Sequence, residues 1–221
     1  MLPPFDAILF DYDGTLAVLN LDFAAMRQQL LAFTVTQGIA ASALQDFDIL
    51  EMLTHATGLL QQRQPAHATR YAQAAEQLLR DIEVTAAQHS CLLPGVPELL
   101  TALQRAAIGV GIVTRNCDAA VRVTFPTLET YCQAFVPRDR VTHVKPHPEH
   151  LTTALDALGV PPERALMVGD GAMDMQAGKA LGMFSIGVLS GTTSRATLLA
   201  QGADLVLPHA VDLLPYIQAR P

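Results

Sequence analysis

Cysteines and long apolar runs are scarce in this sequence, and each scarcity excludes a class of protein. The three cysteines are odd in number and form no C-x-x-C pair, so we expect reduced thiols in a cytoplasmic protein. No run of eighteen apolar residues occurs, so no membrane-spanning helix is expected. The first residues lack the basic region and the apolar stretch of a signal peptide, which agrees with a cytoplasmic protein.

Basic residues are also few. The chain carries 14 Lys and Arg against 21 Asp and Glu, and it has no cluster of Lys and Arg. Because nucleic acids and anionic membranes bind to such clusters, we expect neither as a partner. Half of the 221 residues are hydrophobic, which is enough for a sizeable core in one large domain or one and a half. Nothing in the sequence indicates an oligomeric state.

Short apolar runs alternate with amphipathic helical stripes over most of the chain. This alternation predicts an α/β fold, with a parallel sheet covered by helices on both faces. The runs expected to form strands are residues 7–10, 108–113, 135–136, 165–168, 184–188 and 205–207.

The segment from about residue 22 to residue 89 departs from this alternation. It shows apolar residues at helical spacing and no strand pattern, with Gly38, Gly58 and Pro65 as expected breaks between three helices. Three such helices make a small bundle. We therefore predict a core domain of residues 1–18 and 91–221. The inserted helical cap domain, residues 19–90, is expected to cover the crevice at the end of the first strand.

Polar residues follow several of the expected strands at the point where each should end. Because the carboxyl ends of parallel strands meet at one edge of a sheet, where ligands bind in open α/β folds, these side chains should converge on one site. They are Asp11 and Asp13 after the first strand, Thr114, Arg115 and Asn116 after the second, Lys145 after the third, and Asp170 and Asp174 after the fourth.

This set of side chains suits a phosphate and a divalent cation. Crowded carboxylates repel one another and are stable mainly when a cation binds between them, and Mg²⁺ prefers carboxylate and carbonyl oxygens. Thr114 and Lys145 supply the hydroxyl and the positive charge that a phosphate needs. A carboxylate beside both can attack phosphorus and form an aspartyl phosphate. For Asp13 and Gly14 alone, the alternative is an ordinary Asp-Gly turn.

Other polar residues near these strand ends have alternative interpretations. A helix is expected to begin near Asn116, which either binds the phosphate or caps that helix. Arg115 either contacts the substrate or forms a surface ion pair. The histidines around Lys145 are His143, His147 and His150. A zinc site on the last two would need further ligands, and no cysteine stands near, so we favour solvated or helix-capping histidines.

The motifs Asp11-x-Asp13-Gly14-Thr15, Thr114, Lys145-Pro146 and Gly169-Asp170-x-x-x-Asp174 occur in this order, with a helical insertion after the first. In this arrangement the chain resembles the haloacid dehalogenase (HAD) superfamily, and within it the helical-cap subfamily that includes phosphoglycolate phosphatases. The resemblance covers about residues 5–207. It implies a Rossmann-like core with a small helical cap and a Mg²⁺-dependent phosphatase. The implied substrate is a small phosphorylated metabolite, with a phosphoglycolate-like compound as one candidate.

The resemblance also implies residue roles. Asp11 is the nucleophile, and Asp13 is the general acid that protonates the leaving oxygen and later activates water. The metal ligands are Asp11, Asp170 and the backbone carbonyl of Asp13, with Asp174 in support. The phosphate is bound by Thr114 and Lys145, with Arg115 and Asn116 as further candidates.

Two other functions stay open at this point. A phosphomutase of the same superfamily would return the phosphoryl group to its substrate instead of to water. A non-catalytic module that binds phosphate or a partner would keep only the fold. Asp13 argues against such a module, because an alkoxide leaving group needs a proton donor and simple binding does not. Substrate choice is implied to lie in the cap, where Arg27, Arg63, Arg70 and Arg80 either bind a carboxylate or face solvent.

Overall fold

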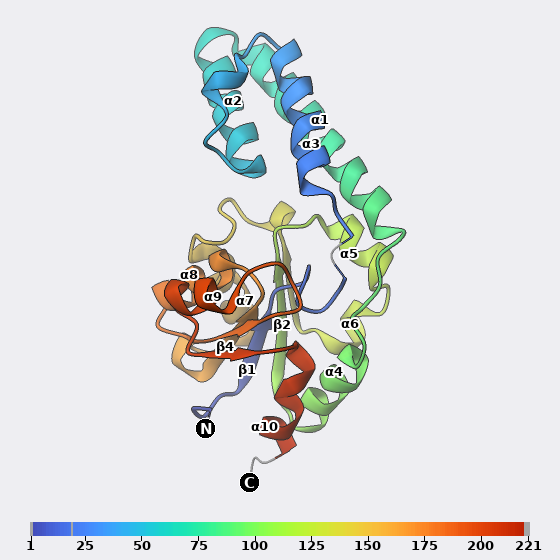
Figure 1. Ribbon diagram of the computed structural model, residues 1–221, viewed down its shortest axis with the longest axis vertical. Coiled ribbons are helices and arrows are strands. Elements are labelled where there is room, and N and C mark those ends of the chain that lie inside the picture. The colour runs from blue at the N-terminus through green and yellow to red at the C-terminus, as the bar shows by residue number, and fades with distance from the viewer. Residues whose placement is uncertain (1, 19, 219–221) are drawn as a thin grey trace. The chain divides into compact units, whose positions relative to one another are not determined.

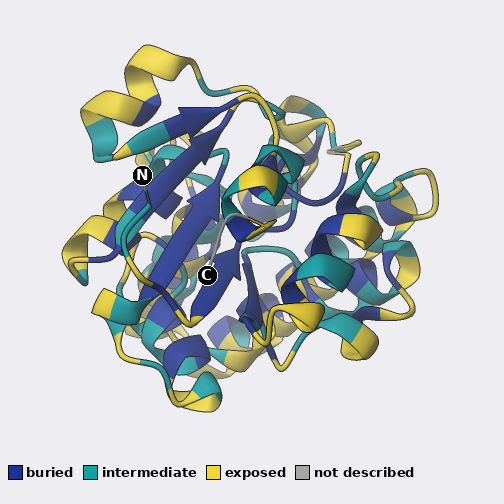
Figure 2. Ribbon diagram, turned by 90° about the horizontal axis from the view of Figure 1, so that it is seen from below, coloured by how far each residue is buried: buried dark blue, intermediate teal, exposed yellow. Residues whose placement is uncertain are grey.

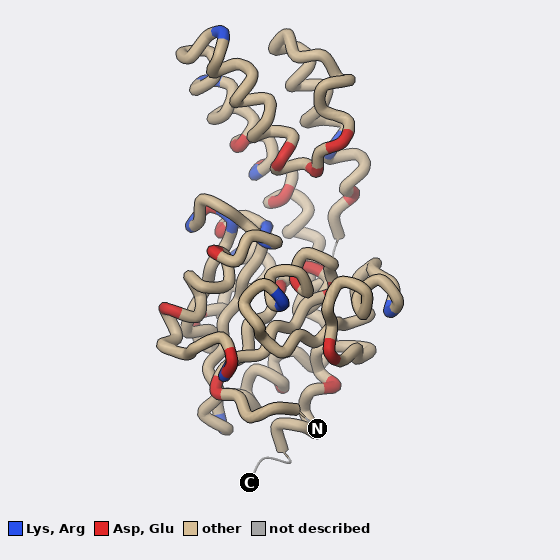
Figure 3. The backbone as a smooth tube through the Cα atoms, turned by 90° about the vertical axis from the view of Figure 1, so that its left-hand side faces the viewer, with Lys and Arg blue, Asp and Glu red and all other residues tan. Residues whose placement is uncertain are grey.

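The computed structural model describes residues 2–18 and 20–218, which divide into two compact units (Figure 1). The larger unit comprises residues 1–19 and 89–221, and the smaller comprises residues 20–88. Acidic residues occur on both units, interspersed with fewer basic ones (Figure 3). Within the described residues, none of the helices has the length and apolar character needed to cross a membrane.

The larger unit is built on a six-stranded sheet with the order β3-β2-β1-β4-β5-β6, in which all neighbours are parallel. This is the strand order of a Rossmann-type sheet, and it confirms the predicted fold class. Strands β2 and β3 lie on one side of β1, and strands β4, β5 and β6 lie on the other. The strand order therefore reverses between β1 and β4, which makes this position a topological switch point. The strands are β1 (Ala7–Phe10), β2 (Gly109–Thr114), β3 (Ala134–Pro137), β4 (Ala165–Gly169), β5 (Phe184–Val188) and β6 (Leu205–Leu207).

Helices cover both faces of the sheet because the central strand is apolar on both sides (Figure 2). Ile8 and Phe10 pack into a core with α4, whereas Ala7 and Leu9 pack into a second core with α7. The helices of this unit are α4 (Val96–Arg105), α5 (Asp118–Thr124), α6 (Leu128–Tyr131), α7 (Glu149–Leu158), α8 (Ala172–Ala180), α9 (Arg195–Gln201) and α10 (Leu214–Gln218).

Two details at the end of β2 differ from the sequence-based expectation. The strand begins at Gly109 and includes Thr114, one residue later than predicted at each end. The following helix, α5, begins at Asp118, two residues after Asn116 and thus near it as predicted, but its N-cap is Cys117 and not Asn116. The Asn116 side chain accepts the N–H of Cys117 at 2.8 Å and therefore does not cap the first turn of α5.

The smaller unit contains α1 (Phe23–Thr36), α2 (Ile49–Arg63) and α3 (Pro65–Ala87). Asp48 and Glu51 form a capping box, and α2 therefore begins after Asp48 although a stripe of apolar residues, Leu44 and Phe47, precedes it. Gly58 lies within α2, so its interpretation as a break was wrong. These helices enclose a core of their own, in which the buried hydroxyls of Thr34 and Tyr71 hydrogen-bond at 2.7 Å.

Candidate active site

The candidate site begins at the switch point, where β1 and β4 lie side by side. Phe10 pairs with Val168, and the N–H of Asp11 donates to the Val168 carbonyl at 2.8 Å, so Asp11 follows directly on the paired strand. The chain then turns at Gly14, whose φ is +78°. A Cβ at Gly14 would lie 2.7 Å from Asp170 Oδ2. Glycine is therefore required both by the backbone conformation and by the approach of Asp170.

Lys145 joins the carboxylates of this edge. Its side chain is buried, and its Nζ lies 2.6 Å from Asp11 Oδ1, 2.6 Å from Asp174 Oδ1 and 2.7 Å from the Val113 carbonyl. Burial alone would lower the pKa of Lys145, but the charges of Asp11 and Asp174 outweigh it and raise the pKa. Lys145 is thus a fixed buried cation that holds two of the predicted acidic residues.

Asp170 completes an acidic cluster with Asp11 and Asp174, in which carboxylate oxygens of the three lie within 4.8 Å of one another. Thr15 donates to both Asp11 Oδ2 at 3.3 Å and Asp170 Oδ1 at 3.4 Å. Burial, followed by the charges of Asp11 and Asp174, raises the pKa of Asp170 to about 8. Burial likewise raises the pKa of Asp174, to about 6, although Lys145 opposes it. A divalent cation among these oxygens would offset that repulsion, so the donor set fits Mg²⁺.

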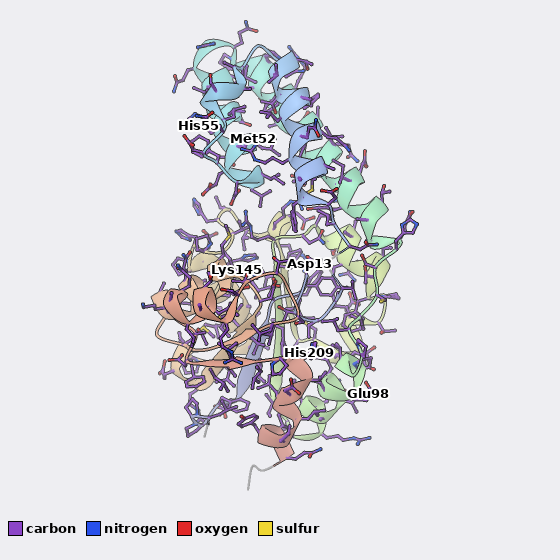
Figure 4. All side chains as sticks on the ribbon, in the orientation of Figure 1. Asp13, Met52, His55, Glu98, Lys145 and His209 are labelled. Carbon is purple, nitrogen blue, oxygen red and sulfur yellow. The ribbon has the colours of Figure 1, made fainter. Side chains whose placement is uncertain are left out.

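Asp13 is held on the other side of the turn by residues that follow β2. Asn116 Nδ2 lies 3.1 Å from Asp13 Oδ2, and Thr114 Oγ1 lies 3.4 Å from the same oxygen. The N–H of Asn116 donates to Thr114 Oγ1 at 3.0 Å, which fixes the hydroxyl that reaches Asp13. Asp13 and Lys145 are both labelled in Figure 4. The structure therefore brings these polar residues of three strand ends together, as the parallel sheet required.

Comparison with known proteins identifies the family of this chain. The model of the haloacid dehalogenase-like hydrolases matches residues 8–188, which include every residue of the site described above. The chain belongs to this family. This confirms the resemblance seen in its motifs.

Relatives of this hydrolase carry several names. It is 30% identical to an N-acetylmuramic acid 6-phosphate phosphatase of Pseudomonas aeruginosa, over 94% of this chain and 92% of that protein. It is 38% identical to the pyrophosphatase PpaX of Bacillus cereus, over 55% of this chain and only 57% of PpaX. The crystal structure of a hydrolase from Pseudomonas syringae has the same fold, with a TM-score of 0.68, 22% identity and coverage of 96% of this chain and 98% of the other.

His150 is a residue of this hydrolase whose position the sequence did not reveal. It is buried, whereas His143 and His147 are exposed. Its Nδ1 accepts the N–H of Lys145 at 3.0 Å, and its Nε2 lies 3.0 Å from the Val136 carbonyl. Since a carbonyl only accepts, Nε2 carries the proton and the ring is neutral. Burial, helped by the charge of Lys145, lowers the pKa of His150 to about 3.

The prediction of a solvated or capping histidine was therefore wrong for His150. The ring bridges two segments at the carboxyl edge of the sheet and holds the backbone of Lys145. A signal was present in the sequence, because His150 continues the apolar stripe of Leu151, Ala154 and Leu155, all of which are buried in α7.

The loop after β5 also contributes to the site and was missed. Ser190 donates to the Gly14 carbonyl at 2.7 Å. A Cβ at Gly191 would lie 1.7 Å from Asp170 Oδ2, so this loop packs directly on that carboxylate. The rule applied to the other strands, that ligand-binding residues follow the carboxyl ends of parallel strands, would have found this Ser-Gly pair.

Arg115 lies at the same edge but makes a contact that neither interpretation foresaw. Its guanidinium contacts the sulfur of Met173, at the beginning of α8, and its backbone carbonyl accepts from Arg138 Nη1 at 3.4 Å. Its side chain thus links the segment after β2 to the segment after β4.

Proposed function

We propose that this hydrolase is a Mg²⁺-dependent phosphatase that hydrolyses a small phosphorylated metabolite through an aspartyl phosphate at Asp11. The observation that carries the proposal is the position of Lys145 between Asp11 and Asp174, with Asp13 held two residues further along. A buried lysine and a buried carboxylate cluster at a switch point are suited to binding a phosphoryl group and to attacking it.

In the first half of the reaction, a carboxylate oxygen of Asp11 forms a bond to phosphorus. The bond from phosphorus to the substrate oxygen breaks, and Asp13 donates its proton to that oxygen. Lys145 remains beside Asp11 and favours the charge that accumulates on the phosphoryl oxygens. Thr114 and Asn116 hold the Asp13 carboxylate, and this would direct it toward the leaving oxygen.

In the second half, Asp13 takes a proton from a water molecule that attacks phosphorus. The bond between phosphorus and Asp11 breaks, inorganic phosphate leaves, and Asp11 and Asp13 return to their first states. The phosphomutase alternative differs only here, since a substrate hydroxyl would take the place of water.

The metal is assigned to the carboxylates of Asp11 and Asp170 and to the backbone carbonyl of Asp13. Asp174 takes a supporting place, because its Oδ1 already contacts Lys145 and its Oδ2 accepts the N–H of Gly171 at 2.9 Å. When bound, Mg²⁺ supplies positive charge that offsets the negative charge of the phosphoryl oxygens.

We propose that residues 19–90 form a cap domain that restricts the choice of substrate, and that residues 1–18 and 91–221 form the core domain. Among the cap arginines, Arg27 forms its hydrogen bonds within the helical unit. Its Nη2 donates to the carbonyls of Leu44, Gln45 and Phe47 at 3.0, 3.0 and 3.1 Å. We therefore assign Arg27 to the stability of the cap and not to the substrate.

The proposed substrate class rests on a relative that matches this chain over nearly its whole length. That protein is named for a sugar acid 6-phosphate, and the chains align over nearly their whole lengths. We propose a phosphorylated small metabolite of comparable size, with phosphoglycolate as the smaller candidate. The odd number of cysteines and the lack of a C-x-x-C pair support a cytoplasmic site of action.

The test is release of inorganic phosphate from sugar phosphates, phosphoglycolate, nucleotides and an aryl phosphate, with Mg²⁺ and with EDTA. Asp11→Asn should keep the fold and lower kcat by at least about 10³-fold, because an amide cannot form the acyl phosphate. Circular dichroism of the variant serves as the control for folding. Equal turnover by parent and variant would exclude the mechanism. Turnover only with a sugar bisphosphate primer would favour the mutase.

A further inference from the structure

A second group of metal-binding side chains lies on the surface between β3 and α7, apart from the acidic cluster. It consists of His143, His147 and Glu149, which offer ligand atoms within 4.8 Å of one another. His143 Nδ1 lies 2.6 Å from Glu149 Oε2, and His147 Nδ1 lies 3.9 Å from the same oxygen. The two imidazole rings are 4.6 Å apart between centroids.

The donor types distinguish this group from the acidic cluster. Two imidazoles and one carboxylate form a ligand set that suits Zn²⁺ and neighbouring first-row metals and that leaves a coordination position open. Mg²⁺ prefers oxygen ligands and would select the aspartates instead. The sequence alone could not show this set, because it suggested His147 and His150 as the pair, whereas His150 is buried and Glu149 takes its place.

The segment that carries the three ligands is held firmly from the inside. Lys145, which lies between His143 and His147 in the sequence, is buried. Both its Nζ and its backbone N–H form hydrogen bonds. His150 is buried immediately after Glu149. A proline precedes and another follows His147, and each fixes its own φ. The ligands therefore project from a preorganised segment, which lowers the entropy that metal binding must overcome.

An ordinary surface ion pair between His143 and Glu149 would explain part of this arrangement. His147 caps the start of α7, because its Nδ1 accepts the N–H of Glu149 at 3.2 Å, and its ring lies 4.6 Å from that of His143. Two imidazole rings beside one carboxylate are also the donor set of many Zn²⁺ sites, so the arrangement suits a metal as well as an ion pair.

We propose that His143, His147 and Glu149 form a surface binding site for Zn²⁺, separate from the site assigned to Mg²⁺. Because its ligands flank Lys145 in the sequence, a bound ion would stabilise the segment that positions this lysine at the carboxyl edge of the sheet. The proposal does not depend on the proposed phosphatase activity.

The experiment is a Zn²⁺ titration of the full chain in millimolar Mg²⁺, in competition with a chromophoric chelator. We expect one saturable Zn²⁺ site, and an increase in melting temperature as it fills. His143→Ala and His147→Ala should each weaken the affinity by at least about tenfold, since even residues behind the ligands contribute that much in known sites. Glu149→Gln should have a similar effect while still accepting the N–H of Thr142.

The matched control is His209→Ala, which removes an exposed histidine of the same unit outside the cluster (labelled in Figure 4) and should leave Zn²⁺ affinity unchanged. Repeating the titration with Asp170→Asn separates any Zn²⁺ that enters the acidic cluster. Equal affinity in the parent, His143→Ala and His147→Ala would overturn the proposal. So would binding that disappears with Asp170→Asn alone, or that fails to saturate.

Discussion

At the scale of single residues, Lys145 and His150 show how a candidate catalytic side chain is held in place by a buried neighbour. The lysine contacts two carboxylates through Nζ, while its backbone N–H is held by a buried neutral imidazole. A change at His150 should therefore reach the reaction through the position of Lys145, and we regard His150 as a positioning residue.

We expect His150→Leu to reduce stability and turnover together. It leaves the Lys145 N–H and the Val136 carbonyl buried without their partner, which should lower the free energy of unfolding by about 1–3 kcal/mol. Displacement of Lys145 should lower kcat, by up to about 10²-fold for a shift of about 1 Å, with a smaller effect on KM.

The conservative variant His150→Asn separates the two effects. Its side-chain oxygen can still accept the Lys145 N–H, although the bond to Val136 is lost. Urea unfolding and steady-state kinetics should then show a stability between those of the parent and His150→Leu, with most of kcat restored. Equal kcat values in the Leu and Asn variants would argue against a positioning role.

At the scale of elements, the strands were predictable from the sequence and the helix boundaries of the smaller unit were less so. Fully buried parallel strands appear as short apolar runs, and all six were found to within a residue or two. The start of α2 depended instead on the capping box of Asp48 and Glu51, a polar signal that overrides the apolar stripe before it.

Gly58 and Gly38 provide a matched test of how these helices are built. Gly58 lies inside α2 with open space where an added methyl group would point, so Gly58→Ala should stabilise the smaller unit by about 1 kcal/mol. Gly38 has a φ of +86°, so Gly38→Ala should destabilise it even though space is also free there. Thermal unfolding followed by circular dichroism measures both changes, and shifts in the same direction would contradict this account of the two glycines.

At the scale of the whole molecule, the site exists only because segments about 160 residues apart meet. The sequence predicted which strand ends converge, since a parallel sheet dictates it. Signals for the Ser-Gly pair after β5 and for the burial of His150 were present, but the contacts of Gly191 with Asp170 and of His150 with Lys145 depend on how loops and helices pack. The polar residues of the site were therefore predictable from the sequence, but the contacts that hold them in place were not.

The acidic cluster should give the protein a distinctive dependence on pH when divalent cations are removed. The pKa of Asp170 is about 8 in the folded protein, against about 3.9 for an ordinary aspartate in an unfolded chain. Between these values the folded state binds a proton that the unfolded state does not. The free energy of unfolding in EDTA should therefore decrease as the pH rises from about 4 to about 8.

Mg²⁺ should reverse that loss at about pH 8, by about 2.7 kcal/mol when its free concentration is a hundred times its Kd. Urea unfolding with Mg²⁺ and with EDTA across this pH range measures both effects. Asp170→Asn is the control, because it should weaken the dependence on pH and on Mg²⁺ together. Stability that is unaffected by Mg²⁺ in the parent would contradict a metal site at these aspartates.

The place of β1 in the sheet has a consequence for biosynthesis. This strand leaves the ribosome long before its two neighbours in the sheet, β2 and β4, which begin at Gly109 and Ala165. The helices of residues 20–88, which have their own core, are complete before either neighbour has been made. The nascent chain must therefore carry an unpaired Ala-Ile-Leu-Phe strand during much of its translation, a segment on which chaperones would be expected to act.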